Sequence, residues 1–267
     1  MIPANRRARP LSWCLSTFWF VSSVTMSIGC SGSVEGPSTS PPPASLPTAL
    51  TVSPSISFLF IGQAQPLAAT LHFSDGHVEP AVGARWTSSS SSVLTVDAAG
   101  LTLGQNNGVA TVTATASGFS QSVTVRVAPD YRGNWVGTYV PTACARDATF
   151  PLVNFCAAAA AGGPQPMTLR LTQDHLQTAG TLSVSDASAD FRGTVNDDGS
   201  LSVTATLQQS SAGLPFSILV APWQSSLQSG QMIGQFVMNW TTTAASGSGQ
   251  IQATLQGVVR SATFLQR

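Results

Sequence analysis

Residues 84–114 read ARWTSSSSSVLTVDAAGLTLGQNNGVATVTA. The end of this stretch alternates Thr with Ala or Val, which is the pattern of a β-strand with one buried face. Gly, Asp and Asn stand between the apolar runs, where turns would fall. Further alternating runs lie on both sides, such as PLAATLHF before it and SVTVRV after it. About seven short strands in some 80 residues predict a β-sandwich over residues 48–128.

The same region resembles the bacterial immunoglobulin-like group 2 family. The motifs of that family appear in order as LTVSPS, IGQAQPLAAT, the stretch 84–114 and SVTVRV. Trp86 stands where the family keeps a buried tryptophan, and Leu101 fills the apolar position of its V-D-x-x-G-x-V stretch. The resemblance implies a β-sandwich of the kind found in bacterial surface proteins, including adhesins, often as a spacer. It implies no catalytic residues.

Residues 129–267 predict a second antiparallel β domain. After the run GNWVGTYV, seven further alternating segments occupy 167–173, 180–186, 189–196, 199–208, 215–221, 230–240 and 249–260. Most connections are short, and NDDG is a typical hairpin turn. Evenly spaced strands joined in this way favour an eight-stranded up-and-down barrel. The expected fold class is therefore all-β, an Ig-like sandwich followed by a barrel.

The alternation puts the apolar side of the barrel strands inside and the polar side toward water. Eight strands make a barrel just wide enough to be filled by its own side chains, so a filled core is favoured. The alternative is a cavity, because GNWVGTY weakly resembles the first strand of lipocalins and avidin-type barrels. In that case a small apolar ligand would contact Trp135, Tyr139, Met238 and Trp240. If the barrel is filled, Trp223 could instead be part of an exposed aromatic patch.

The first 29 residues resemble a secretory signal peptide, with Arg6, Arg7 and Arg9 before a mostly apolar segment. The local sequence SIGC resembles the lipobox of bacterial lipoproteins, which implies cleavage before Cys30 and attachment of a diacylglyceryl group to its thiol. Ser27 departs from that pattern and would also suit an ordinary signal peptidase. Residues 30–47 are rich in Ser and Pro and predict a flexible tether.

The remaining cysteines predict one disulfide. Cys14 would leave with the signal peptide, and Cys30 would be acylated. Cys144 and Cys156 then form an even pair in an exported and therefore oxidising setting. They lie in the long connection 140–166 between the first two barrel strands.

Composition and motifs exclude several function classes. Eight Arg and eleven Asp or Glu follow residue 29, a net charge of −3, so no basic surface for nucleic acid is expected. The usual catalytic motifs are absent, and we predict no catalytic residue, cofactor or metal site. His72 and His77, near Asp75 and Glu79, are interpreted as polar residues of an exposed hairpin.

These features together predict a non-enzymatic cell-envelope protein, anchored by lipid and placed in the outer membrane. An Ig-like spacer would present a barrel that binds a protein or glycan partner. The alternative hypothesis is a lipocalin-like carrier of a small apolar ligand.

Overall fold

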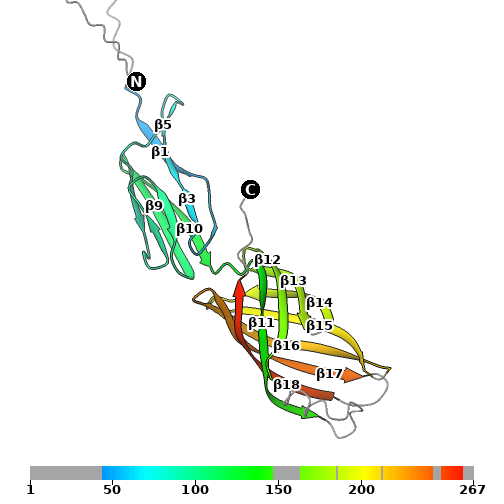
Figure 1. The fold of residues 1–267 in the computed structure, drawn as a ribbon. Helices are drawn as coiled ribbons and strands as arrows, with labels where there is room; N and C mark the ends of the chain where they lie inside the picture. Colours follow the sequence, from blue (N-terminus) through cyan, green and yellow to red (C-terminus); the bar gives the residue numbers. More distant parts are fainter. Residues whose placement is uncertain (1–43, 147–162, 185, 212, 243–247, 261–267) are drawn as a thin grey trace, which may run out of the picture. The chain divides into compact units, whose positions relative to one another are not determined.

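The computed structural model describes residues 44–146, 163–184, 186–211, 213–242 and 248–260 (Figure 1). The regular elements in these ranges are all β-strands, numbered β1 to β18. The all-β prediction is therefore confirmed. Among the described residues there is no helix long and apolar enough to cross a membrane.

Ten strands make up the N-terminal sandwich, which we use as the name for β1–β10. They form three sheets with the orders β1-β4-β5, β2-β10-β9-β6 and β3-β8-β7, and β2 runs parallel to β10. About seven strands were expected, and the larger number arises because several strands have only three residues. The bounds are β1 Pro47–Ser53, β2 Phe58–Phe60, β3 Ala64–Pro66, β4 Ala68–Phe73, β5 Val78–Pro80, β6 Arg85–Ser88, β7 Leu94–Val96, β8 Leu101–Gly104, β9 Gly108–Ala116 and β10 Phe119–Ala128.

The apolar side of the alternating strands forms the interior of the sandwich. Val112 of β9 packs with Leu59 and Leu94 in one cluster, whereas Ala114 of the same strand packs in a second cluster. Trp86 is half-buried and contacts both clusters. It therefore joins the two halves of the core rather than lying fully inside one of them.

The TVDAAGL motif forms a tight turn between β7 and β8. Asp97 Oδ1 accepts hydrogen bonds from the backbone N–H groups of Ala99 and Leu101, both at 2.9 Å. Gly100 has a φ of +84° and lies against the Trp86 ring, and an added Cβ would overlap the carbonyl oxygen of Leu67. The motif therefore needs Asp to cap the turn and Gly to allow the backbone its positive φ.

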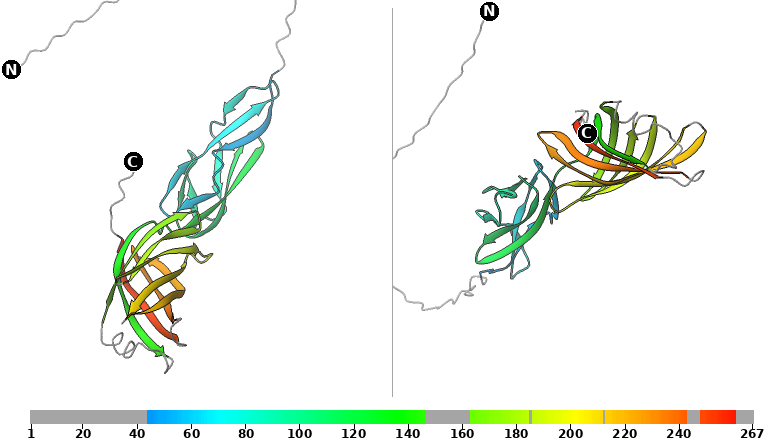
Figure 2. Two further views of the ribbon diagram at one scale, coloured as in Figure 1. Left: turned by 90° about the vertical axis from the view of Figure 1, so that its right-hand side faces the viewer. Right: turned by 90° about the horizontal axis from the view of Figure 1, so that it is seen from below.

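The remaining eight strands form a closed barrel, with consecutive strands paired and β18 returning to β11 (Figures 1 and 2). Each strand lies where the sequence predicts one, so the eight-stranded up-and-down barrel is confirmed. The bounds are β11 Gly133–Arg146, β12 Gln165–Asp174, β13 Gln177–Val184, β14 Ala187–Val195, β15 Leu201–Ser211, β16 Leu214–Gln228, β17 Gln231–Thr242 and β18 Ser248–Arg260.

Strand β16 differs most from its prediction, because it continues past residue 221 to Gln228. Its pairing register with β17 shifts between Val220 and Trp223, so Ala221 and Pro222 together stand opposite one residue of β17. Such a bulge is one of the few places where a strand accommodates proline. Because side chains alternate between the two faces, one extra residue exchanges the faces beyond it. Trp223 therefore points into the barrel and is 1% exposed, and its predicted place in an exposed patch is wrong.

Candidate functional site

The four residues predicted to line a ligand cavity lie together in the barrel core. Trp135, Tyr139, Met238 and Trp240 are each less than a tenth exposed and belong to one cluster of buried side chains. The indole N–H of Trp135 donates to the backbone oxygen of Tyr131 at 2.8 Å. The ring of Tyr139 packs edge-on against Phe236, with 5.5 Å between centroids. All four side chains are therefore part of the packed core.

Other large side chains fill the space between these four residues. Trp223 stacks on Phe236 with 5.0 Å between ring centroids, and its indole N–H donates to Ser225 Oγ at 3.1 Å. Leu182, Leu207 and further apolar residues from every strand between β12 and β17 join the same cluster. Among the described residues, the packing favours a filled core over a carrier cavity.

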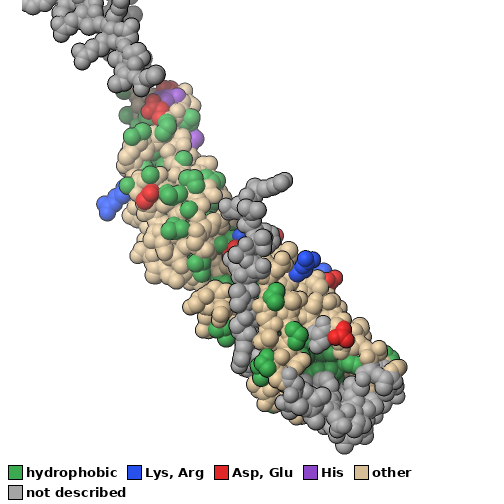
Figure 3. All heavy atoms as spheres, in the orientation of Figure 1, with side chains coloured by type: hydrophobic (Ala, Val, Ile, Leu, Met, Phe, Trp, Pro, Cys, Tyr) green, Lys and Arg blue, Asp and Glu red, His purple; other side chains and the backbone are tan. Residues whose placement is uncertain are grey.

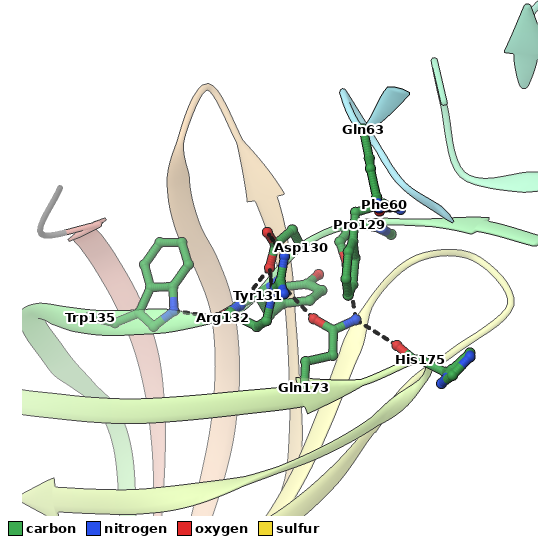
Figure 4. A network of polar contacts seen from close by, with 9 residues as sticks. All are labelled: Phe60, Gln63, Pro129, Asp130, Tyr131, Arg132, Trp135, Gln173 and His175. Atoms are coloured by element: carbon green, nitrogen blue, oxygen red, sulfur yellow. Dashed lines mark hydrogen bonds and ion pairs between the residues drawn. The ribbon is translucent and has the colours of Figure 1, made fainter. Parts of the chain in front are cut away.

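Tyr131 and Gln173 form a buried polar network at the end of the barrel where the chain enters (Figure 4). The backbone N–H of Tyr131 donates to Gln173 Oε1 at 2.8 Å. The amide nitrogen of Gln173 donates to the backbone oxygens of Pro129 and His175, at 3.1 and 2.8 Å. The Tyr131 hydroxyl donates to the Gly199 carbonyl at 2.8 Å. Tyr131 was not predicted as a site residue, although it shares the period-two alternation of Trp135 and Tyr139.

The surroundings of Tyr131 predict a loss of stability at alkaline pH. Burial is the main cause that raises the pKa of Tyr131 to about 12, and the charge of Asp198 contributes to this rise. A pKa that is raised on folding stabilises the fold fully below the unfolded value near 10, and this contribution disappears as the pH rises toward 12. In urea unfolding, the chain should therefore lose more stability between pH 9 and pH 12 than its Tyr131→Phe variant. Equal losses in both proteins would show that the hydroxyl is not buried.

The predicted lipidation and disulfide sites lie wholly or partly outside the described residues. This applies to Cys30 and to Cys156, so both modifications stay predictions. Cys144 is described: it lies on β11 and is partly buried against the barrel core. Strand β11 extends to Arg146, so the predicted connection 140–166 begins later in the structure than in the sequence prediction.

A shallow hollow of about 1010 Å³ lies along strands β12 to β15. Exposed side chains form much of its lining, including Thr172, Asp174, Asp190, Arg192 and Thr204. These groups include hydrogen-bond donors and acceptors, and they carry both negative and positive charges. In the view of Figure 3, blue and red side chains lie next to each other on the barrel, among uncharged polar atoms and scattered apolar ones. Such a surface suits a polar partner of low charge.

The histidines of the sandwich form local contacts in the hairpin between β4 and β5. His77 contacts Asp75 at 2.5 Å and Glu79 at 3.4 Å, and its ring stacks on Phe73. The hydrogen bonds from His77 hold the pKa of the Asp75 carboxyl below its usual value. Within the described part of the chain, no group of three or more His, Cys, Asp or Glu side chains is arranged to hold a metal ion.

Comparison with protein families identifies the sandwich. Residues 48–127 match the family described as "Bacterial Ig-like domain (group 2)". This part of the chain is therefore similar to the domains of that family. The match runs from the second residue of β1 to the penultimate residue of β10. The sandwich resemblance inferred from the sequence motifs is thereby confirmed.

Two further comparisons add little to this identification. The solved structure "S-layer protein SbsC, domains 5-6" aligns with 78% of this chain and 98% of its own, at 11% identity and a TM-score of 0.29. That similarity is too low to support an argument about the barrel. A search of curated proteins gives no match. The match of residues 48–127 is therefore the comparison that supports a non-catalytic module of the cell envelope.

Proposed function

We propose that the chain is an exported, lipid-anchored and non-enzymatic protein of the cell envelope, in which the Ig-like domain is a spacer that presents the barrel to a partner. The observation that carries this proposal is the match of residues 48–127 to a bacterial Ig-like family. Domains of this family are typical of bacterial cell-surface proteins. The signal-like first 29 residues agree with that location.

The barrel is the part of the chain that we assign to partner binding. Its described interior is packed with apolar side chains, so a partner would contact its outer surface. The hollow along β12 to β15 offers Asp190, Arg192 and several threonines for hydrogen bonding. Because these groups are mixed in sign and mostly uncharged, the surface fits a protein loop or a neutral glycan. A nucleic acid would require a basic surface.

The anchor in this proposal is a lipid on Cys30. The Ser- and Pro-rich residues that follow Cys30 would hold the folded part away from the membrane. Ser31 follows Cys30 where an Asp would favour retention in the inner membrane, so we assign the anchor to the outer membrane.

The anchor is tested by growing cells with an alkyne-tagged fatty acid and locating the protein. We expect the native protein to carry the tag and to sediment with membranes. The Cys30→Ser variant should carry no tag and should appear in the soluble periplasmic fraction. The Cys14→Ser variant is the matched control and should behave like the native protein. An untagged native protein in the soluble fraction would instead support cleavage by an ordinary signal peptidase.

A further inference from the structure

The connection between the Ig-like domain and the barrel is short and partly buried. Strand β10 ends at Ala128 and β11 begins at Gly133, so four residues join the two domains. Ala128 and Tyr131 are both fully buried and belong to the core cluster of the barrel. The last residue of the Ig-like domain and the middle of the connector are therefore already part of the barrel.

Polar contacts fix the connector within the barrel end. Gln173 of β12 binds the connector twice, at the Pro129 oxygen and at the Tyr131 N–H. Arg132 forms a two-pronged ion pair with Asp130, and its guanidinium lies 4.2 Å from the centre of the Phe60 ring (Figure 4). Phe60 belongs to β2 of the Ig-like domain, so this contact reaches back from the connector to that domain.

A second set of polar contacts joins the two domains away from the connector. Arg126 of β10 donates to the backbone oxygens of Asn196 and Asp197, at 3.4 and 3.3 Å, in the turn between β14 and β15. It also donates to Asn107 Oδ1 at 3.2 Å. The Asn107 amide in turn donates to the Asp197 oxygen at 2.8 Å. One turn of the barrel is thus held by two side chains of the Ig-like domain.

Aromatic packing supplies a third contact. Phe58 of β2 lies 4.9 Å from the ring of His175, in the turn between β12 and β13. Phe58 also packs against the core cluster of the barrel and edge-on against Phe60. This contact involves a different barrel turn from the one that Arg126 holds. Two turns and the connector therefore constrain the junction at separate points.

We propose that the Ig-like domain and the barrel form one rigid, cooperative unit, in which Phe58, Asn107 and Arg126 are a docking surface for the barrel of the same chain. Domains joined in one chain ordinarily move relative to each other unless their interface restrains them. Here three separate sets of contacts restrain the junction, and residues 45–267 form one compact unit. The barrel would then be presented in one orientation, and a partner could not enter through the barrel end that the connector closes.

This inference is independent of the proposed function, because it concerns the junction alone. It is tested by ¹⁵N relaxation on the mature soluble chain, made by replacing Cys30 with Ser. A rigid junction gives one rotational correlation time for the strand amides of both domains. In the double variant Phe58→Ala/Arg126→Ala we expect two different and shorter correlation times, with the amide spectrum of each domain still dispersed.

Two further variants separate the contributions at Arg126. The Asp197 side chain is fully exposed, so its ion pair with Arg126 at 3.5 Å should contribute little. The Asp197→Asn variant keeps the backbone acceptors, so its two domains should share one rotational correlation time, as in the native chain. Arg126→Lys should loosen the junction, since an ammonium group cannot reproduce the planar contacts of guanidinium. Equal loosening by Asp197→Asn would contradict the role given to the backbone oxygens.

The relaxation measurement on the native chain tests the proposed rigid junction even if the double variant fails to fold. Two correlation times in the native chain would overturn it. A single time in a folded double variant would also overturn it, because the junction would then not depend on these side chains. Asn107→Ala changes a loop residue outside the strands and provides a milder version of the same test.

Discussion

Replacing Trp135 with alanine is expected to lower the free energy of unfolding by about 3–5 kcal/mol. Trp135 is 1% exposed, packs in the barrel core and donates its indole N–H to the Tyr131 oxygen. The substitution removes a large apolar surface and leaves a cavity that the surrounding strands cannot fully close. Urea unfolding monitored by far-UV circular dichroism measures the change.

The control for Trp135→Ala is the neighbouring Val136→Ala. Val136 is 54% exposed on the outer face, so its truncation should change stability by less than about 1 kcal/mol. If Trp135 instead lined an empty ligand cavity, its truncation would cost little more than that of Val136. Equal and small effects of the two variants would therefore contradict a filled core.

Replacing Gly180 with alanine is expected to cost about 3 kcal/mol. Gly180 of β13 lies opposite Leu171 in the pairing with β12, and an added Cβ would overlap the backbone oxygen of Arg170. The same Cβ would lie 3.1 Å from the Phe191 ring. Forcing a methyl group against a backbone oxygen requires the strands to separate, and overpacking of this kind typically costs 1 to about 3 kcal/mol.

The direction in which Gly180→Ala changes the free energy of unfolding distinguishes a crowded site from one with room for a methyl group. At a site that accepts alanine, the same substitution stabilises a protein by roughly 0.4–1 kcal/mol, because it restricts the unfolded chain. Ala179→Val is the matched control, since Ala179 is exposed on the same strand and should accept a larger side chain. A Gly180→Ala variant as stable as the native chain would show that β12 and β13 do not approach so closely.

Most of the fold could be predicted because buried and exposed side chains alternate along its strands with a period of two residues. All eight barrel strands were expected from alternation, and apolar residues on the expected inner face, such as Leu169, Val203 and Phe236, are buried. The Ig-like domain could be predicted because its turn motif has a local cause, the capping of the turn by Asp97. Such features depend on neighbours in sequence and can be read without a structure.

Trp223 was placed incorrectly because the alternation changes phase within its strand. Pro222 indicates an interruption, but the sequence does not show whether the strand ends there or continues through a bulge. The structure shows a bulge, after which the opposite set of side chains points inward. Tyr131 could have been found by extending the alternation of Trp135 and Tyr139 backward, although the Pro-Asp pair before it indicates a loop.

The junction could not be predicted from the sequence. Arg126 and Asn107 bind the turn at Asp197, which lies 71 and 90 residues later in the chain. Both side chains lie within stretches that match the Ig-like family, but nothing in those stretches indicates a distant partner, and both would suit an exposed strand or loop equally well. Their partners depend on how two domains dock, which periodicity within either domain does not reveal.

Native mass spectrometry of the mature soluble chain, carrying Cys30→Ser and purified oxidised from the periplasm, tests the central claim most directly. A filled, non-carrier barrel predicts the mass of the polypeptide alone, less the two hydrogens lost in a Cys144–Cys156 disulfide. A reproducible additional mass, displaced when the chain is unfolded, would contradict the filled core. It would then identify the barrel as a carrier and indicate the class of its ligand.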